Sequence, residues 1–175
     1  MTTFFRRMAV VFLFISLLTL CCSCQTTPSS EVPTTDTPTT EVLVPNAASD
    51  FDYDIFEKDG ERVIRLIRYK GEHTDVVIPA TIEGLPVRIL LGVTAQNDKG
   101  YTGMVQGVFE DTSIKSVYIP SSVSSLGGGT FAHCTKLEQV EFAKGCGITS
   151  LNTSDFEGCT ALTRIDLSPL TKLKG

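Results

Sequence analysis

One short apolar pattern recurs three times between Ser113 and Leu167, and it limits the possible folds more than any other feature of the sequence. Each copy places apolar residues at its first, fourth and sixth positions. The copies are Ile114-x-x-Val117-x-Ile119, Leu137-x-x-Val140-x-Phe142 and Leu162-x-x-Ile165-x-Leu167. Their last positions lie 23 residues apart (142 minus 119) and 25 residues apart (167 minus 142). This spacing predicts stacked units, each of which buries its apolar face against its neighbours.

The residues around these copies repeat as well. A Phe precedes each copy, and a Cys follows that Phe at the same offset in the last two units. These residues are Phe109, Phe131, Phe156, Cys134 and Cys159. An earlier copy, Val76-x-Ile78-Pro79, returns as Val117-x-Ile119-Pro120. The period lies in the leucine-rich-repeat range, so we expect a β-rich leucine-rich-repeat solenoid with short parallel strands and irregular or 3-10 returns.

The residues from Phe51 to Tyr69 predict two strands joined by a turn. The first run alternates with period two, the second is apolar, and Asp59-Gly60 between them is a hairpin signal. A solenoid needs a cover over its first unit. Residues 51–72 are therefore predicted to be an N-terminal β-hairpin cap, and residues 73–175 the repeats.

The first repeat contains an insertion. The Phe of the later units follows the preceding apolar residue by five positions (131 minus 126 and 156 minus 151). The same step is 19 positions from Leu90 to Phe109, so 14 extra residues (19 minus 5) lie within 91–108. Insertions in repeats form surface loops, some of them on the binding face. Tyr101 and Met104 are candidate contact residues of this loop, and a merely tolerated loop is the alternative.

Only SPLTKLKG follows the third copy, which is too short for another turn or a capping helix. A bare parallel strand leaves unpaired backbone groups at its edge. Three explanations stay open: the chain is a truncated member of a longer lineage, its final residues fold over the edge, or a partner covers it.

Residues 1–24 predict a signal peptide. Arg6 and Arg7 precede an apolar run from Met8 to Leu20, which is shorter than the roughly 20 residues that a membrane-spanning helix needs. An N-terminal membrane anchor is the alternative. Residues 25–50 are rich in Thr, Ser and Pro, so we expect a disordered stalk that holds a folded domain, residues 51–175, away from a surface.

The end of the signal segment resembles the lipobox of bacterial lipoproteins, in which Leu and a small residue precede a Cys that becomes lipidated. Cys24 follows the small residue Ser23 and is the predicted lipidation site, with Cys21 and Cys22 as alternatives. The resemblance implies that an N-terminal lipid anchors the chain to a membrane of the bacterial cell envelope, outside the cytoplasm.

The charge balance argues against nucleic acid as a partner. The formal net charge is −5, with 15 basic and 20 acidic residues. Binding to phosphates needs clustered Lys and Arg, and the sequence has no such cluster.

The repeat resembles a known family. Residues 119–140, IPSSVSSLGGGTFAHCTKLEQV, are similar to the unit IPxxVxxIGxxAFxxCxxLxxV of BspA-type leucine-rich-repeat surface proteins. Residues 78–87, IPATIEGLPV, are similar to the usual first repeat of that family. The chain departs from the pattern at the insertion and at two extra residues around Lys144–Gly147. Members are extracellular or surface-attached bacterial proteins, many implicated in adhesion, so the resemblance implies a binding surface and no reaction.

No catalytic, cofactor or metal site is predicted, because the sequence has no nucleophile elbow and neither His73 nor His133 has a second ligand candidate nearby. Cys134 and Cys159 are expected to stack on adjacent turns as small buried thiols, with a disulfide as the alternative. Cys146 lies in the two-residue insertion and is expected to be exposed.

Alternate residues of the three strand copies are predicted to form a binding face. Side chains on a strand point to opposite sides in turn. The expected inward residues are Val117, Ile119, Val140, Phe142, Ile165 and Leu167. The expected outward residues, which form the candidate binding face, are Ser116, Tyr118, Gln139, Glu141, Arg164 and Asp166. A simply solvated face is the alternative.

These patterns favour a membrane-anchored, surface-exposed repeat protein that binds an unidentified protein or cell-surface ligand in an adhesion-like, non-catalytic way. The alternative is a structural envelope component that assembles through its open C-terminal repeat edge.

Overall fold

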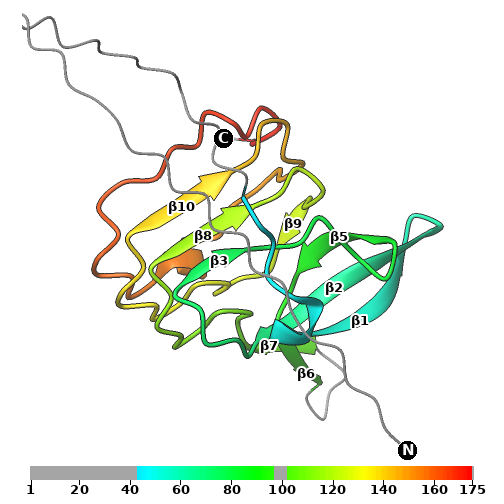
Figure 1. The fold of residues 1–175 in the computed structure, drawn as a ribbon, viewed down its shortest axis with the longest axis horizontal. Coiled ribbons are helices and arrows are strands. Elements are labelled where there is room, and N and C mark those ends of the chain that lie inside the picture. Colours follow the sequence, from blue (N-terminus) through cyan, green and yellow to red (C-terminus); the bar gives the residue numbers. More distant parts are fainter. Residues whose placement is uncertain (1–42, 97–101, 175) are drawn as a thin grey trace, which may run out of the picture. The chain divides into compact units, whose positions relative to one another are not determined.

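The computed structural model describes residues 43–96 and 102–174, which form a strand-rich fold with two short 3-10 helices, η1 (Ala48–Asp50) and η2 (Thr153–Phe156) (Figure 1). The strands are β1 (Phe51–Lys58), β2 (Glu61–Tyr69), β3 (Asp75–Val77), β4 (Thr81–Ile82), β5 (Leu85–Leu90), β6 (Val93–Gln96), β7 (Thr102–Gln106), β8 (Ser116–Ile119), β9 (Ser125–Leu126) and β10 (Gln139–Phe142). The strand-rich class that the repeat period predicts agrees with these elements.

Successive copies of the repeat pair as a parallel ladder in the order β10-β8-β3 (Figure 1). Val117 of β8 aligns with Val76 of β3 and with Val140 of β10, while Ile119 aligns with Phe142. All five side chains are at most 4% exposed. The inward orientation predicted for the residues of β8 and β10 is therefore confirmed.

A second ladder follows the order β2-β5-β9. β2 and β5 are parallel, as are β5 and β9, where Leu90 aligns with Leu126. The antiparallel strands β1 and β4 flank β2 and β5 respectively. Buried side chains of both ladders belong to one apolar core, so each turn contributes to that core from two sides.

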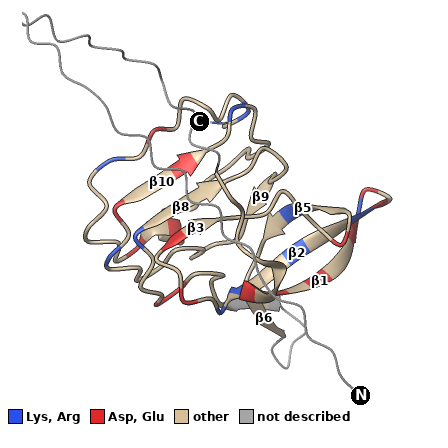
Figure 2. Ribbon diagram, viewed as in Figure 1, with Lys and Arg blue, Asp and Glu red and all other residues tan. Residues whose placement is uncertain are grey.

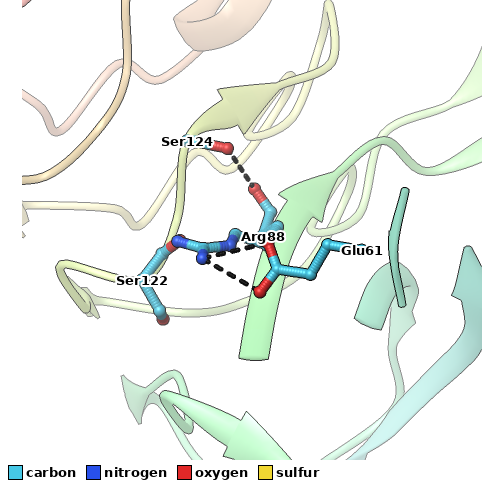
Figure 3. A network of polar contacts seen from close by, with 4 residues as sticks. All are labelled: Glu61, Arg88, Ser122 and Ser124. Atoms are coloured by element: carbon cyan, nitrogen blue, oxygen red, sulfur yellow. Dashed lines mark hydrogen bonds and ion pairs between the residues drawn. The ribbon is translucent and has the colours of Figure 1, made fainter. Parts of the chain in front are cut away.

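The predicted hairpin is formed by β1 and β2. Asp59 and Gly60 at its turn have φ values of 53° and 78°, the positive angles that a tight hairpin turn uses. Near this turn, Glu61 accepts a hydrogen bond from Arg88 of β5 at 3.2 Å, and the Ser124 hydroxyl donates to the Arg88 carbonyl at 3.4 Å (Figure 3). These contacts link the hairpin to the repeats, and because the ion pair is partly exposed it contributes at most about 1 kcal/mol.

Five aromatic rings form a continuous stack through the core. Neighbouring ring centroids lie 5.2–5.4 Å apart. The stack, in order, consists of Phe51, Tyr69, Phe109, Phe131 and Phe156. The last two pairs are nearly parallel, with interplanar angles of 11° and 7°. The sequence pattern identified the three recurring Phe residues but not the first two members, which belong to the hairpin.

Backbone hydrogen bonds connect the turns that carry these rings. The N–H of a ring-bearing residue donates to the carbonyl just before the next ring. These bonds run from Tyr69 to Val108 at 2.8 Å, from Phe109 to Thr130 at 2.9 Å and from Phe131 to Asp155 at 2.9 Å. Tyr69 therefore occupies the position that Phe has in later turns.

A left-handed backbone conformation recurs two positions after each recurring Phe. Asp111, His133 and Gly158 have φ values of 59°, 59° and 73°. At the third position, a Cβ added to the glycine would lie 2.6 Å from Nδ1 of His133. Asp111 and His133 show that this φ tolerates other residues, so glycine at position 158 mainly leaves room for the imidazole of the preceding turn.

The insertion is a hairpin and not the irregular loop that we expected. β6 and β7, on either side of residues 97–101, pair antiparallel. Of the two candidate loop residues, Tyr101 lies outside the described residues, and Met104 lies on β7 opposite Thr94.

The third copy of the pattern does not form the predicted strand. Residues 162–167 have no strand conformation, Ile165 is half-buried, and Leu167 is 38% exposed. Ile165 nevertheless packs against the core, so the predicted inward orientation is wrong for Leu167 only. In the preceding turn the Ala143 N–H bonds to the Ile119 carbonyl, whereas here the Asp166 carboxylate accepts the equivalent Ser168 N–H at 2.9 Å. A local bond thus replaces one rung of the ladder.

The residues after the third copy fold against the core. Leu170 is 4% exposed, Leu173 packs against the core, and the Lys174 N–H donates to the Thr149 carbonyl at 2.9 Å. Among the three explanations for the end of the repeats, these contacts fit the one in which the final residues fold over the last turn.

Replacing Phe131 by Ala is expected to lower the free energy of unfolding by about 3–5 kcal/mol, because the ring is fully buried between two others. Urea denaturation measures the change. The matched variant Phe56→Ala removes a ring that is 39% exposed and should cost about 1 kcal/mol or less. Equal losses in both variants would contradict the role of the aromatic stack.

Candidate binding face

The parallel ladder β3-β8-β10 places two columns of side chains on the side opposite the core. The register of the strand pairs aligns the residues of each column across the three strands. The first column consists of Asp75, Ser116 and Gln139, and the second of Val77, Tyr118 and Glu141. None of these six residues, which we call the strand face, is buried. The four predicted residues on β8 and β10 therefore do lie together.

Two hollows border the strand face. One, of about 240 Å³, is lined by residues of both columns and by Leu43, which precedes the first strand. The other, of about 380 Å³, lies between β10 and the next turn, where Arg164 and Asp166 line it with Gln139 and Glu141. The structure thus brings all six predicted residues to one connected surface, although Arg164 and Asp166 come from an irregular segment.

Asp75 was not among the predicted face residues. Its carboxylate accepts hydrogen bonds from the Ser116 hydroxyl at 2.6 Å and from the Thr74 hydroxyl at 3.1 Å. The bond from Ser116, followed by that from Thr74, holds the pKa of Asp75 below its ordinary value. The signal was present in the sequence, because Asp75 precedes Val76 as Ser116 precedes Val117.

The charge on this surface is mainly negative. Acidic residues lie on β3 and β10 (Figure 2), and Asp166 continues the series in the next turn. The Ser168 N–H is the main cause that lowers the pKa of Asp166. Arg164 is the one cation among the residues that line the two hollows, and it forms no ion pair with a described residue.

The outer edge of β3 is covered by the segment before the hairpin. The N–H of Asn46 donates to the Val77 carbonyl at 2.9 Å, and its side-chain oxygen accepts the Val77 N–H at 2.8 Å. The strand face is therefore closed at this edge by the chain's own residues.

The three cysteines of the repeats are buried free thiols. Cys134 donates to the Phe109 carbonyl at 2.9 Å, and Cys159 donates to the Phe131 carbonyl at 3.0 Å. The buried thiol ladder predicted for this pair is confirmed. The expected exposure of Cys146 is wrong: it is fully buried and donates to the Val123 carbonyl at 3.3 Å, because the turn around it folds inward.

The two histidines, the other residues considered for metal binding, have no cluster of ligand residues around them in the described ranges. His73 and His133 are exposed, and no group of three His, Cys, Asp or Glu residues in the described ranges is placed to hold a metal ion. No helix among the described residues is long and apolar enough to cross a membrane.

Comparisons with known proteins agree with this geometry. A family model described as "BspA type Leucine rich repeat region" matches residues 102–174 in six copies. The structure of the Treponema pallidum Leucine Rich Repeat protein (TpLRR) is similar, with 27% identity and a TM-score of 0.57 over 70% of this chain and 50% of that one. A leucine rich cell surface protein from Faecalibacterium prausnitzii A2-165 shares the fold, with 19% identity and a TM-score of 0.50 over 69% of this chain and 30% of that one.

The chain thus spans half or less of the length of these two solved structures. No curated protein matches it significantly.

The Cys159 thiol provides a test of the packing at the end of the ladder. Burial raises its pKa from 9.0 to about 11, so the folded chain keeps a proton that the unfolded chain loses. The thiol's contribution to stability is therefore fully present below pH 9 and is lost as the pH rises toward about 11. In urea denaturation, unsubstituted protein should lose stability over this window by about 1 kcal/mol per pH unit more than Cys159→Ala. Parallel pH profiles for the two proteins would contradict this assignment.

Proposed function

We propose that this protein, whose residues 102–174 are a BspA-type leucine-rich repeat region, is displayed on a bacterial cell surface and binds a protein ligand through the strand face, without catalysis. The leucine rich cell surface protein from Faecalibacterium prausnitzii, which shares the fold, supports the display part of the proposal.

The observation that carries the binding proposal is the registered pair of columns on β3, β8 and β10. Their side chains are accessible, while the alternate residues of the same strands are anchored in the core. A site on hydrogen-bonded strands is held more rigidly than one on loops, so less ordering entropy is lost when a ligand binds.

The chemistry of the strand face favours a partner segment with basic groups. Asp75 and Glu141 are accessible carboxylates, and Gln139 offers an amide. Tyr118 offers a ring surface in the middle of the second column. Carboxylates attract Lys and Arg at long range, and a tyrosine ring stacks on guanidinium and aliphatic groups. We expect binding to weaken with rising salt concentration.

We also propose that the repeats form a solenoid capped by residues 51–72. The parallel pairing of β2 with β5 and the place of Tyr69 in the aromatic stack support this role, because the hairpin then shields the first repeat from water.

Display requires attachment to the cell envelope. In this proposal, residues 1–24 direct export and Cys24 carries the lipid. The stalk predicted for residues 25–50 ends before residue 43, because residues 43–50 belong to the described fold and include η1. An acylated Cys buries several hydrocarbon chains, which makes the attachment durable.

The strand face is tested by Tyr118→Ala and Glu141→Ala. Pull-down with the full chain from envelope and host-matrix proteins identifies a ligand, and each variant should then weaken its binding by about tenfold or more. Tyr53→Ala is the matched control, because this half-buried tyrosine lies on β1, outside the strand face, and its loss should leave affinity unchanged. Unchanged affinity in both face variants would rule out the strand face as the site.

Lipidation is tested by mass spectrometry of the chain purified from bacterial membranes. The expected N-terminal peptide begins at an acylated Cys24, and Cys24→Ala should leave the precursor unprocessed. Modification at Cys21 or Cys22 would relocate the anchor. An unmodified peptide that spans residues 20–25 would refute the lipid anchor while leaving the binding proposal intact.

A further inference from the structure

The segment from Thr163 to Leu167 makes a single backbone hydrogen bond to the described residues. None of its five N–H groups donates to a described acceptor, and of its carbonyls only that of Leu167 accepts a bond, from the Leu170 N–H at 3.0 Å. This segment is internal, because the residues after it fold back against the core. Unpaired backbone groups in a row are a template for another strand.

The surroundings of the segment leave it accessible. The hollow of about 380 Å³ separates it from β10, with Arg164 and Asp166 on its rim. A second hollow, of about 340 Å³, opens at the same end of the repeats and is lined by Phe156, Cys159 and Ile165. Leu167 is exposed beside these two hollows, and the described residues after it, which pack Leu170 and Leu173 against the core, leave its side chain uncovered.

The sequence of the segment is complementary to itself. In Thr163-Arg164-Ile165-Asp166-Leu167, a cation and an anion flank a central apolar residue. If two copies run antiparallel with Ile165 on the twofold axis, Arg164 of each copy lies opposite Asp166 of the other. Opposite charges directly across two strands stabilise the pair. A parallel pair in register would instead place like charges together, so charge selects the antiparallel arrangement.

We infer that two copies of this chain associate through residues 163–167, which pair antiparallel about Ile165. The pairing satisfies backbone groups on both copies and covers the exposed Leu167. In an antiparallel pair, the side chains of opposed residues lie on one side, so Arg164 and Asp166 of both copies, which line the hollow beside the strand face, lie on the same side. The dimer would therefore present two strand faces on one surface. The inference does not depend on the proposed ligand binding.

The register is tested by cysteine cross-linking of the full chain. Ile165→Cys places two thiols at the twofold axis, where opposed Cα atoms lie about 4.5–5.5 Å apart, within the range of a disulfide. Thr163→Cys is the matched control on the same segment, because its two copies lie four positions out of register, about 13 Å apart. Mild oxidation should convert most of the Ile165→Cys chain to a covalent dimer on a non-reducing gel. Thr163→Cys should give no more dimer than the unsubstituted chain, whose signal-segment cysteines set the background.

The charge pairs are tested by reversal, which leaves the core unchanged. Arg164→Asp and Asp166→Arg each create two like-charge contacts across the axis and should weaken dimerisation by about tenfold in sedimentation equilibrium. The double variant Arg164→Asp/Asp166→Arg should restore it. Equal cross-linking at positions 163 and 165, a chain that stays monomeric at all concentrations, or a double variant that fails to recover would each overturn the inference. Ligand binding by the Tyr118→Ala variant is a separate readout, so the two proposals fail independently.

Discussion

Backbone hydrogen bonds from each turn to the next are the interaction on which the rest of the structure depends. The N–H groups of Tyr69, Phe109 and Phe131 each donate to the following turn, and this sets the distance between turns. At that distance the aromatic rings lie 5.2–5.4 Å apart and the strands align in register. The strand face is a consequence of the same spacing, because its two columns exist only while the strands stay in register.

The spacing also explains which residues the core accepts. At the position three residues after each of the last two recurring Phe residues, the side chain lies beside a carbonyl of the preceding turn, which favours a small residue that can donate a hydrogen bond. Cys134 and Cys159 meet both conditions, since each thiol fits the gap and donates to the carbonyl of a stacked Phe. The cysteines therefore have a packing role, and burial raises the pKa values of their thiols and keeps them protonated at neutral pH.

Sequence periodicity predicted the register of the parallel ladder because apolar side chains alone determine which residues face the core. It failed at residues whose position depends on backbone hydrogen bonds or on the geometry of a turn. Tyr69 joins the aromatic stack from a hairpin strand, 40 residues before Phe109, so no repeat period indicates it. Cys146 is buried by a turn at Gly145, whose φ is 81°. The strand predicted at Ile165 is missing where the Asp166 carboxylate takes the Ser168 N–H in place of a ladder bond, and apolar periodicity does not indicate such a local bond.

The contact between His133 and Gly158 limits how such an array can grow by gene duplication. Other turns carry Asp or His at the left-handed position, but after His133 the position is glycine, and any other residue there would place its Cβ against the imidazole unless the ring took another rotamer. A copy of the His133 unit inserted directly after itself would place one imidazole against the next residue's Cβ. Units that look equivalent in sequence are therefore not freely interchangeable, and a new unit placed after His133 would need a compensating glycine or a different rotamer of the imidazole.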